Sequence, residues 1–142
     1  MDKLVLSGRC IYEGVAEAEV LVSRQAFAFS HGMDPTTGRV CDPLHDWLGQ
    51  NIRGKILVFP YGKGSSTGGL WILEMTRLGN APAGVINLTT EPIIAAGFIM
   101  AAMLYDVSVP IMDNLSQNPV EWLKTGDFVR MDARQGIVEI RR

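Results

Sequence analysis

The most informative feature of this sequence is a loop rich in glycine and hydroxyl residues, which lies between a predicted strand and a predicted helix. The apolar run at residues 55–59 ends at Pro60 and is typical of a buried strand. Residues 70–79 carry apolar side chains on most faces and end at a glycine, as helices often do. Between them, residues 60–69 hold four glycines, one lysine and three consecutive hydroxyl residues. Backbone N–H groups of such a loop and the following helix N-terminus favour an anion, so we expect the chemistry to lie on residues 63–67.

The composition is typical of one folded domain spanning residues 1–142. Apolar residues make up 47% of the chain and charged residues 20%, which argues against disorder. The formal net charge is −2 and no basic run is present, so we expect neither nucleic acid nor a membrane surface as a partner. The two cysteines, Cys10 and Cys41, are too few for a disulfide framework or a four-thiolate metal site.

The sequence carries no export or membrane signal that we recognise. Residues 1–7 lack the long apolar core of a signal peptide. The apolar stretch at residues 93–105 is 13 residues long, whereas a membrane span needs about 18 or more. We therefore expect a cytoplasmic, soluble domain.

Apolar runs and turn residues predict an α/β domain that is β-rich at both ends. The helix predicted to begin at Pro92 is apolar on all faces, so we expect it to be buried against a sheet or a partner protein. The hydroxyl groups of Thr89 and Thr90 are expected to cap its start. Predicted strands cover residues 3–11 (interrupted at Gly8), 16–23, 25–29, 83–88, 107–112, 128–131 and 137–140, and further predicted helices cover residues 92–104 and 119–124.

Residues 30–54 are rich in Gly, Asp, Pro and Thr and predict turns within an ordered loop. This loop holds both histidines, His31 and His45. A histidine that packs in the core or lies at the surface is the usual case. The sequence therefore assigns neither histidine a catalytic role.

Two nucleotide-binding patterns fit the central loop poorly. A Walker A loop needs Gly-Lys followed directly by Ser or Thr, whereas Gly64 follows Lys63. A dinucleotide-binding loop needs a third glycine where Thr67 stands, and an acidic residue at the end of the next strand, where this chain has Asn87. The sequence therefore gives little support to nucleotide binding.

Two further interpretations of the loop remain. The residues from Gly64 to Gly68 match the G-x-S-x-G pattern of a hydrolase nucleophile elbow, with Ser66 as the nucleophile. That fold needs its acid and its histidine downstream, but both histidines lie upstream, so we reject it. Such a loop can also be a tight turn with helix caps. Capping the helix does not require a lysine and three hydroxyl residues together, so the combination of Lys63 with these residues favours a functional site.

Motifs along nearly the whole chain resemble the small subunit of aconitase X. The most specific are Gly-Lys-Ile-Leu-Val-Phe-Pro at residues 54–60 and Gly-Lys-Gly-Ser-Ser-Thr-Gly at residues 62–68. Shorter matches lie at residues 14–17, 21–23, 34–38, 79–83, 91–92 and 124–127. Ala18 and His31 stand where the family commonly has glycine, which affects local loop shape.

The resemblance implies a swivelling β/β/α domain, as in the mobile domain of aconitases. It implies a hydro-lyase (dehydratase) subunit that is active only with a large catalytic subunit carrying the iron–sulfur cluster, since Cys10 and Cys41 cannot hold a cluster by themselves. Family substrates are small hydroxy acids such as phosphomevalonate or cis-3-hydroxy-L-proline, and the sequence does not choose between them. The proton acceptor of the family corresponds to Ser65.

The residues of the loop suit this chemistry. Serine is a poor base unless its alkoxide is stabilised, and loop N–H groups, a helix N-terminus and nearby cations provide that stabilisation. We expect Ser65, as the base, to lie at the mouth of a cleft. We expect the substrate to be bound by Lys63, Gly64, Ser66 and Thr67. The alternative is a non-catalytic swivelling domain that binds a phosphate or carboxylate, or closes over the site of a partner.

Overall fold

The computed structural model describes residues 3–64 and 67–141. In these ranges no helix is both long and apolar enough to cross a membrane. The strands are β1 (Lys3–Ser7), β2 (Arg9–Tyr12), β3 (Val15–Val22), β4 (Ile56–Val58), β5 (Gly84–Ile86), β6 (Ile111–Asp113), β7 (Phe128–Asp132) and β8 (Ile137–Arg141). The helices are α1 (Gly68–Arg77), α2 (Pro92–Tyr105) and α3 (Pro119–Trp122).

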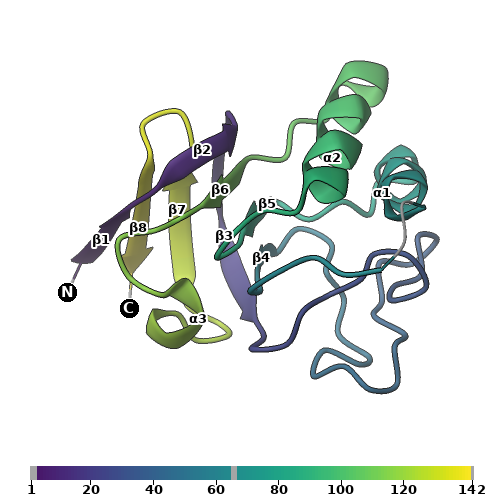
Figure 1. Ribbon diagram of the computed structural model, residues 1–142, viewed down its shortest axis with the longest axis horizontal. Helices are drawn as coiled ribbons and strands as arrows, with labels where there is room; N and C mark the ends of the chain where they lie inside the picture. Colours follow the sequence, from purple (N-terminus) through teal and green to yellow (C-terminus); the bar gives the residue numbers. More distant parts are fainter. Residues whose placement is uncertain (1–2, 65–66, 142) are drawn as a thin grey trace.

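The strands form a nearly closed sheet with an antiparallel half and a parallel half. Their order is β1-β8-β7-β3-β4-β5-β6-β2. Strand β3 joins the halves, because it pairs antiparallel with β7 and parallel with β4. The two ends of this order, β1 and β2, are consecutive in the chain and separated only by Gly8, which brings the outer strands together (Figure 1). This arrangement confirms the predicted swivelling α/β fold.

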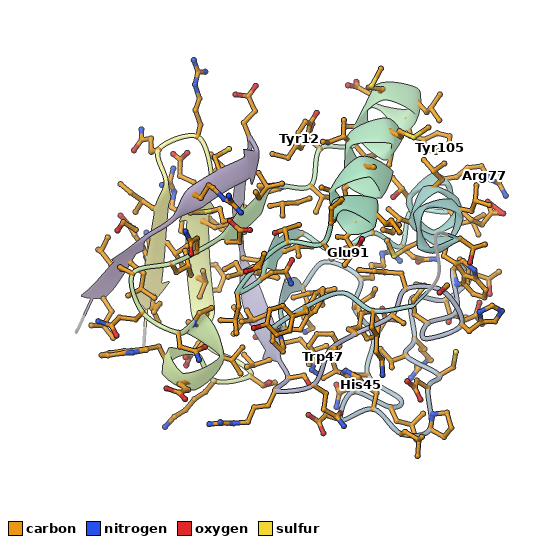
Figure 2. The ribbon with its side chains drawn as sticks, viewed as in Figure 1. Tyr12, His45, Trp47, Arg77, Glu91 and Tyr105 are labelled. Carbon is orange, nitrogen blue, oxygen red and sulfur yellow. The ribbon has the colours of Figure 1, made fainter. Side chains whose placement is uncertain are left out.

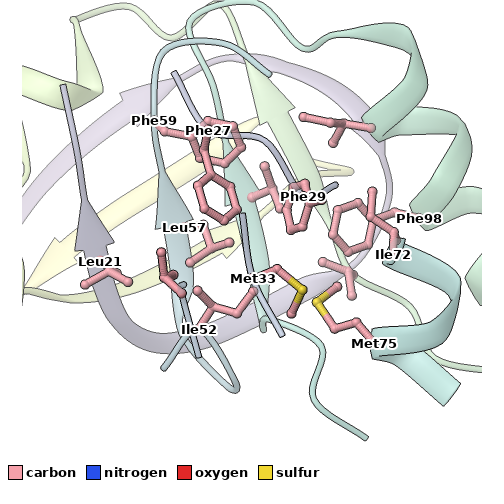
Figure 3. Close-up of a cluster of buried hydrophobic side chains, with 14 of the residues drawn as sticks. Leu21, Phe27, Phe29, Met33, Ile52, Leu57, Phe59, Ile72, Met75 and Phe98 are labelled. Carbon is pink, nitrogen blue, oxygen red and sulfur yellow. The ribbon is translucent and has the colours of Figure 1, made fainter. Parts of the chain in front are cut away.

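Each side of the parallel strands packs against its own apolar core. Alternate residues of a strand face opposite sides, so Leu57 points into one core while Ile56 and Val58 point into the other. The first core lies under the helices and is rich in aromatic rings, as Figure 3 shows. The second fills the space enclosed by the barrel-like sheet. A three-residue strand such as β4 is stable here because all its residues are buried.

Helices α1 and α2 cover the same side of the sheet and lie next to each other (Figure 1). Each follows a parallel strand, so both begin beside the carboxyl ends of the strands. They approach closely at Gly69 and Gly97, where a Cβ on Gly97 would lie 3.2 Å from the Gly69 Cα. Gly79 ends α1 with φ +79° and donates its N–H to the Thr76 carbonyl, as the sequence predicts for a C-terminal glycine.

Most predicted elements are confirmed, and three details are wrong. Residues 25–29 form a single bridge, from Phe27 to Gly62, rather than a strand. The strand predicted at residues 107–112 begins only at Ile111, after Pro110, which cannot donate to a sheet. The N-terminus of α2 is capped by the Glu91 side chain instead of a threonine hydroxyl.

Candidate functional site

The central loop leaves β4 and runs beside an upstream segment of the chain. The Phe27 N–H donates to the Tyr61 carbonyl at 3.1 Å, and the Lys63 N–H donates to the Phe27 carbonyl at 3.0 Å. These bonds add a short parallel pairing to one side of the loop. Because Phe27 is fully packed in the aromatic core, the backbone at Lys63 is fixed relative to the fold.

The opposite side of the loop is held by the segment that follows β5. The buried Asn87 side chain donates from Nδ2 to the Phe59 carbonyl at 2.9 Å, and the Leu88 N–H donates to the Pro60 carbonyl at 3.1 Å. The start of the loop is therefore hydrogen-bonded on one side to the segment at Phe27 and on the other side to residues 87–88. Sequence reasoning did not identify these neighbours, because Phe27 and Asn87 lie far away in the chain and carry no motif.

Gly64 occupies a position that favours glycine. Its φ is +103°, a conformation that residues with a Cβ rarely adopt. A Cβ here would also lie 2.9 Å from the Ser30 Oγ atom and 3.2 Å from the Ala28 Cβ. Backbone conformation and close packing therefore both restrict this position, which was predicted to bind substrate.

The charge and the helix end at this loop favour an anion. Lys63 is exposed and has no ion-pair partner among the residues that the structure describes. Thr67 stands at the N-cap of α1 in helical conformation, and its side chain makes no capping hydrogen bond to the first turn. Ser65 and Ser66, predicted as base and substrate ligand, lie outside the described residues. Lys63, Gly64 and Thr67 are therefore placed at one end of the fold, at the start of α1.

The neighbouring N-terminus of α2 is already occupied by a carboxylate. The two Glu91 oxygens accept the Ile93 and Ile94 N–H groups at 2.9 and 3.2 Å (Figure 2). A side chain that satisfies these amides leaves less positive potential for a ligand. The start of α2 is thus less suited to bind a further anion.

A buried carboxylate anchors the segment between β5 and α2. Asp113 accepts two hydrogen bonds from the Arg9 guanidinium, at 2.8 and 2.7 Å, and one from the Thr90 N–H at 2.8 Å. Burial alone would raise the pKa of Asp113, but the hydrogen bonds from Arg9 and Thr90 outweigh it and the pKa is lowered. The carboxylate therefore stays ionised and holds Thr90 in place.

Neither histidine lies in a position that indicates catalysis. His45 is 5% exposed, contacts the Phe27 and Trp47 rings, and accepts the Trp47 N–H on Nδ1 at 3.1 Å (Figure 2). Burial lowers the pKa of His45, against the opposing charges of Asp46 and Asp42. His31 has a left-handed backbone, with φ 62°, and lies against the Trp71 ring.

The residues that the structure describes offer no ligand set for an iron–sulfur cluster. Cys10 and Cys41 are exposed, and neither forms a disulfide. Across residues 3–64 and 67–141, no group of three or more His, Cys, Asp or Glu side chains could hold a metal ion.

Comparison with known proteins gives consistent results over the full length. The family model of the aconitase X swivel domain matches residues 5–140. The chain is 41% identical to the phosphomevalonate dehydratase small subunit of Methanosarcina acetivorans and 43% identical to that of Methanococcoides burtonii. These alignments cover 99% of this chain and 93% and 98% of the two relatives. The crystal structure of Thermococcus kodakaraensis aconitase X (holo form) matches with a TM-score of 0.88 and 43% identity, covering 98% of this chain and 99% of that chain.

Proposed function

Because this chain belongs to the aconitase X swivel-domain family, we propose that it is the small subunit of a phosphomevalonate dehydratase. The observation that carries the proposal is its likeness, over 99% of its length, to small subunits of that name. The reaction would remove water from a hydroxy acid that also carries a phosphate. A substrate with two anionic groups suits the positive end of α1 and Lys63, which has no ion-pair partner within residues 3–64 and 67–141.

Within this proposal, the loop binds the substrate and moves a proton. Lys63 and the N–H groups around Gly64 attract an anionic group, and Ser66 and Thr67 supply hydroxyl groups for hydrogen bonds. Ser65 accepts the proton that leaves the carbon beside the carboxylate. Its alkoxide is stabilised by the same cation and helix N-terminus, which lower the free energy of a negative charge at this place.

A large subunit would supply the remaining parts of the site. The described residues offer no ligand set for an iron–sulfur cluster, so we assign the cluster to the large subunit. When bound there, it would act as the Lewis acid for the departing hydroxyl group. The present chain then needs only to bind, orient and deprotonate the substrate.

The face formed by the outer sides of α1 and α2 is suited to contact that large subunit. Leu70, Met100, Met103 and Leu104 are exposed there, and α2 contains no charged residue. This α1–α2 surface includes an apolar hollow of 270 Å³ between the helices. Exposed apolar patches of this kind mark protein interfaces, and the surface begins close to the loop that the large subunit would cover.

The purified single chain provides the first test. We expect it to fold, to show no visible absorbance of an iron–sulfur cluster and to catalyse no dehydration. In an extract of its own cells, the tagged chain should bring down a larger protein that contains cysteine-bound iron and sulfur. A stoichiometric cluster or dehydratase turnover in the single chain would contradict the division of roles.

A further inference from the structure

The central loop rests directly on the first turn of α2. At Gly62 a side chain would be crowded, because a Cβ would overlap the Ile94 Cδ1 atom. The same Cβ would lie 3.1 Å from the Ile94 Cγ1 and 3.2 Å from the Glu91 Cβ. The backbone of Gly62 is not left-handed, so packing alone opposes an alanine here. The Ile94 Cδ1 atom is the end of a flexible side chain and can turn aside, whereas the Ile94 Cγ1 and Glu91 Cβ atoms would have to move by a few tenths of an ångström. Gly62 immediately precedes Lys63, so a shift at Gly62 moves the candidate site.

The surface under Gly62 is held in place by several interactions. The Glu91 carboxylate accepts the N–H groups of Ile93 and Ile94 and so fixes the first turn of α2. The preceding Thr90 N–H is bound by the buried Asp113. Ile94 itself is 4% exposed and belongs to the core under the helices. The first turn of α2 is rigid and carries a buried isoleucine, so it is suited to fix the distance between the helix and the loop that contains Gly62.

We infer that Ile94 is a positioning residue, which sets the place of Lys63 and Gly64 through its contact with Gly62. The inference rests on the proposed function, because only that makes residues 63–67 the reacting part of the chain. Ile94 does not touch substrate in this account. It acts through the loop, where a displacement of about 1 Å can cost a 100-fold loss of rate.

A pair of complementary substitutions tests this inference in the reconstituted two-subunit complex. Gly62→Ala should push the loop off α2 and lower kcat roughly 100-fold, with a smaller change in KM. Ile94→Val removes the overlapping Cδ1 atom, so the double variant Gly62→Ala/Ile94→Val should recover at least about tenfold of the lost kcat. Ile140→Val deletes the same methyl group from the other core and is the matched control. It should lower Tm by a few degrees, as Ile94→Val does, but should not rescue Gly62→Ala.

Hydrogen exchange of the single chain gives a readout that needs no activity. The Lys63 N–H is bonded to the Phe27 carbonyl, so Gly62→Ala should speed its exchange and Ile94→Val should restore protection in the double variant. Unchanged exchange in Gly62→Ala, or equal rescue by Ile140→Val, would overturn the inference. If the exchange results are as expected but the wild-type complex dehydrates no phosphomevalonate, the proposed function fails while the contact between Ile94 and the loop stands.

Discussion

In the reconstituted complex, Ser65→Ala is expected to lower kcat roughly 100-fold or more, the usual effect of losing a general base. The alanine keeps the backbone of the loop but removes the hydroxyl group that accepts the proton. Binding should change less, since we assign it to Lys63, Gly64, Ser66 and Thr67. The measurement is steady-state dehydration of phosphomevalonate, with thermal melts to confirm that the variant is folded.

Ser66→Ala is the matched control, because it removes the same group from the adjacent position. A general base must come within about 3 Å of the substrate proton, and one group accepts that proton, so the two variants should differ. Ser66→Ala should therefore raise KM, or lower stability by about 1 kcal/mol if the side chain is a cap. Near-normal kcat in Ser65→Ala together with a collapse in Ser66→Ala would assign the base to Ser66.

A single charge on the α1–α2 surface is expected to prevent assembly. Met103 is 79% exposed and lies in the last turn of α2, where a cation is favourable to the helix dipole. Met103→Lys should thus leave the melting temperature of the single chain unchanged or slightly raised. It should weaken association with the large subunit roughly 100-fold, because burying an unpaired ammonium group in an apolar interface costs several kcal/mol.

The control for this charge is Val5→Lys. Val5 is 53% exposed on β1, which lies on the opposite side of the molecule from α2 (Figure 1). The Val5→Lys substitution should not change the affinity for the large subunit, measured by titration of the labelled small subunit with the large subunit. Equal affinity of Met103→Lys and the wild type would show that the α1–α2 surface is not the interface.

The parts of the fold that local sequence patterns determine were predicted well. The apolar run of β4, the terminal glycine of α1 and the hairpin of β7 and β8 each carry their own signal. Residues 25–29 look like a strand because Phe27 and Phe29 stand two positions apart and both enter the aromatic core, yet the segment forms a single bridge, from Phe27 to Gly62. Their conformation depends on the loop they contact, which no local pattern describes.

The candidate site was predicted only in part. The assignment of Lys63, Gly64 and Thr67 to substrate binding rests on one glycine-rich motif and stays a prediction. The roles of Ile94 and Glu91 could not be predicted, because they depend on the packing of α2 against residues about 30 positions earlier. The cap of α2 was misassigned for a related reason, since threonine is the commoner cap and the Glu91 side chain must fold back to reach the amides.

The most direct test of the account is a titration of the large subunit, loaded with its cluster, with this chain. Dehydration of phosphomevalonate should rise linearly and reach a plateau at an equimolar ratio. Cis-3-hydroxy-L-proline, offered to the same complex, should be turned over far more slowly. A rate that stays at the level of the large subunit alone, or a preference for cis-3-hydroxy-L-proline, would contradict the assignment of this chain as a phosphomevalonate dehydratase small subunit.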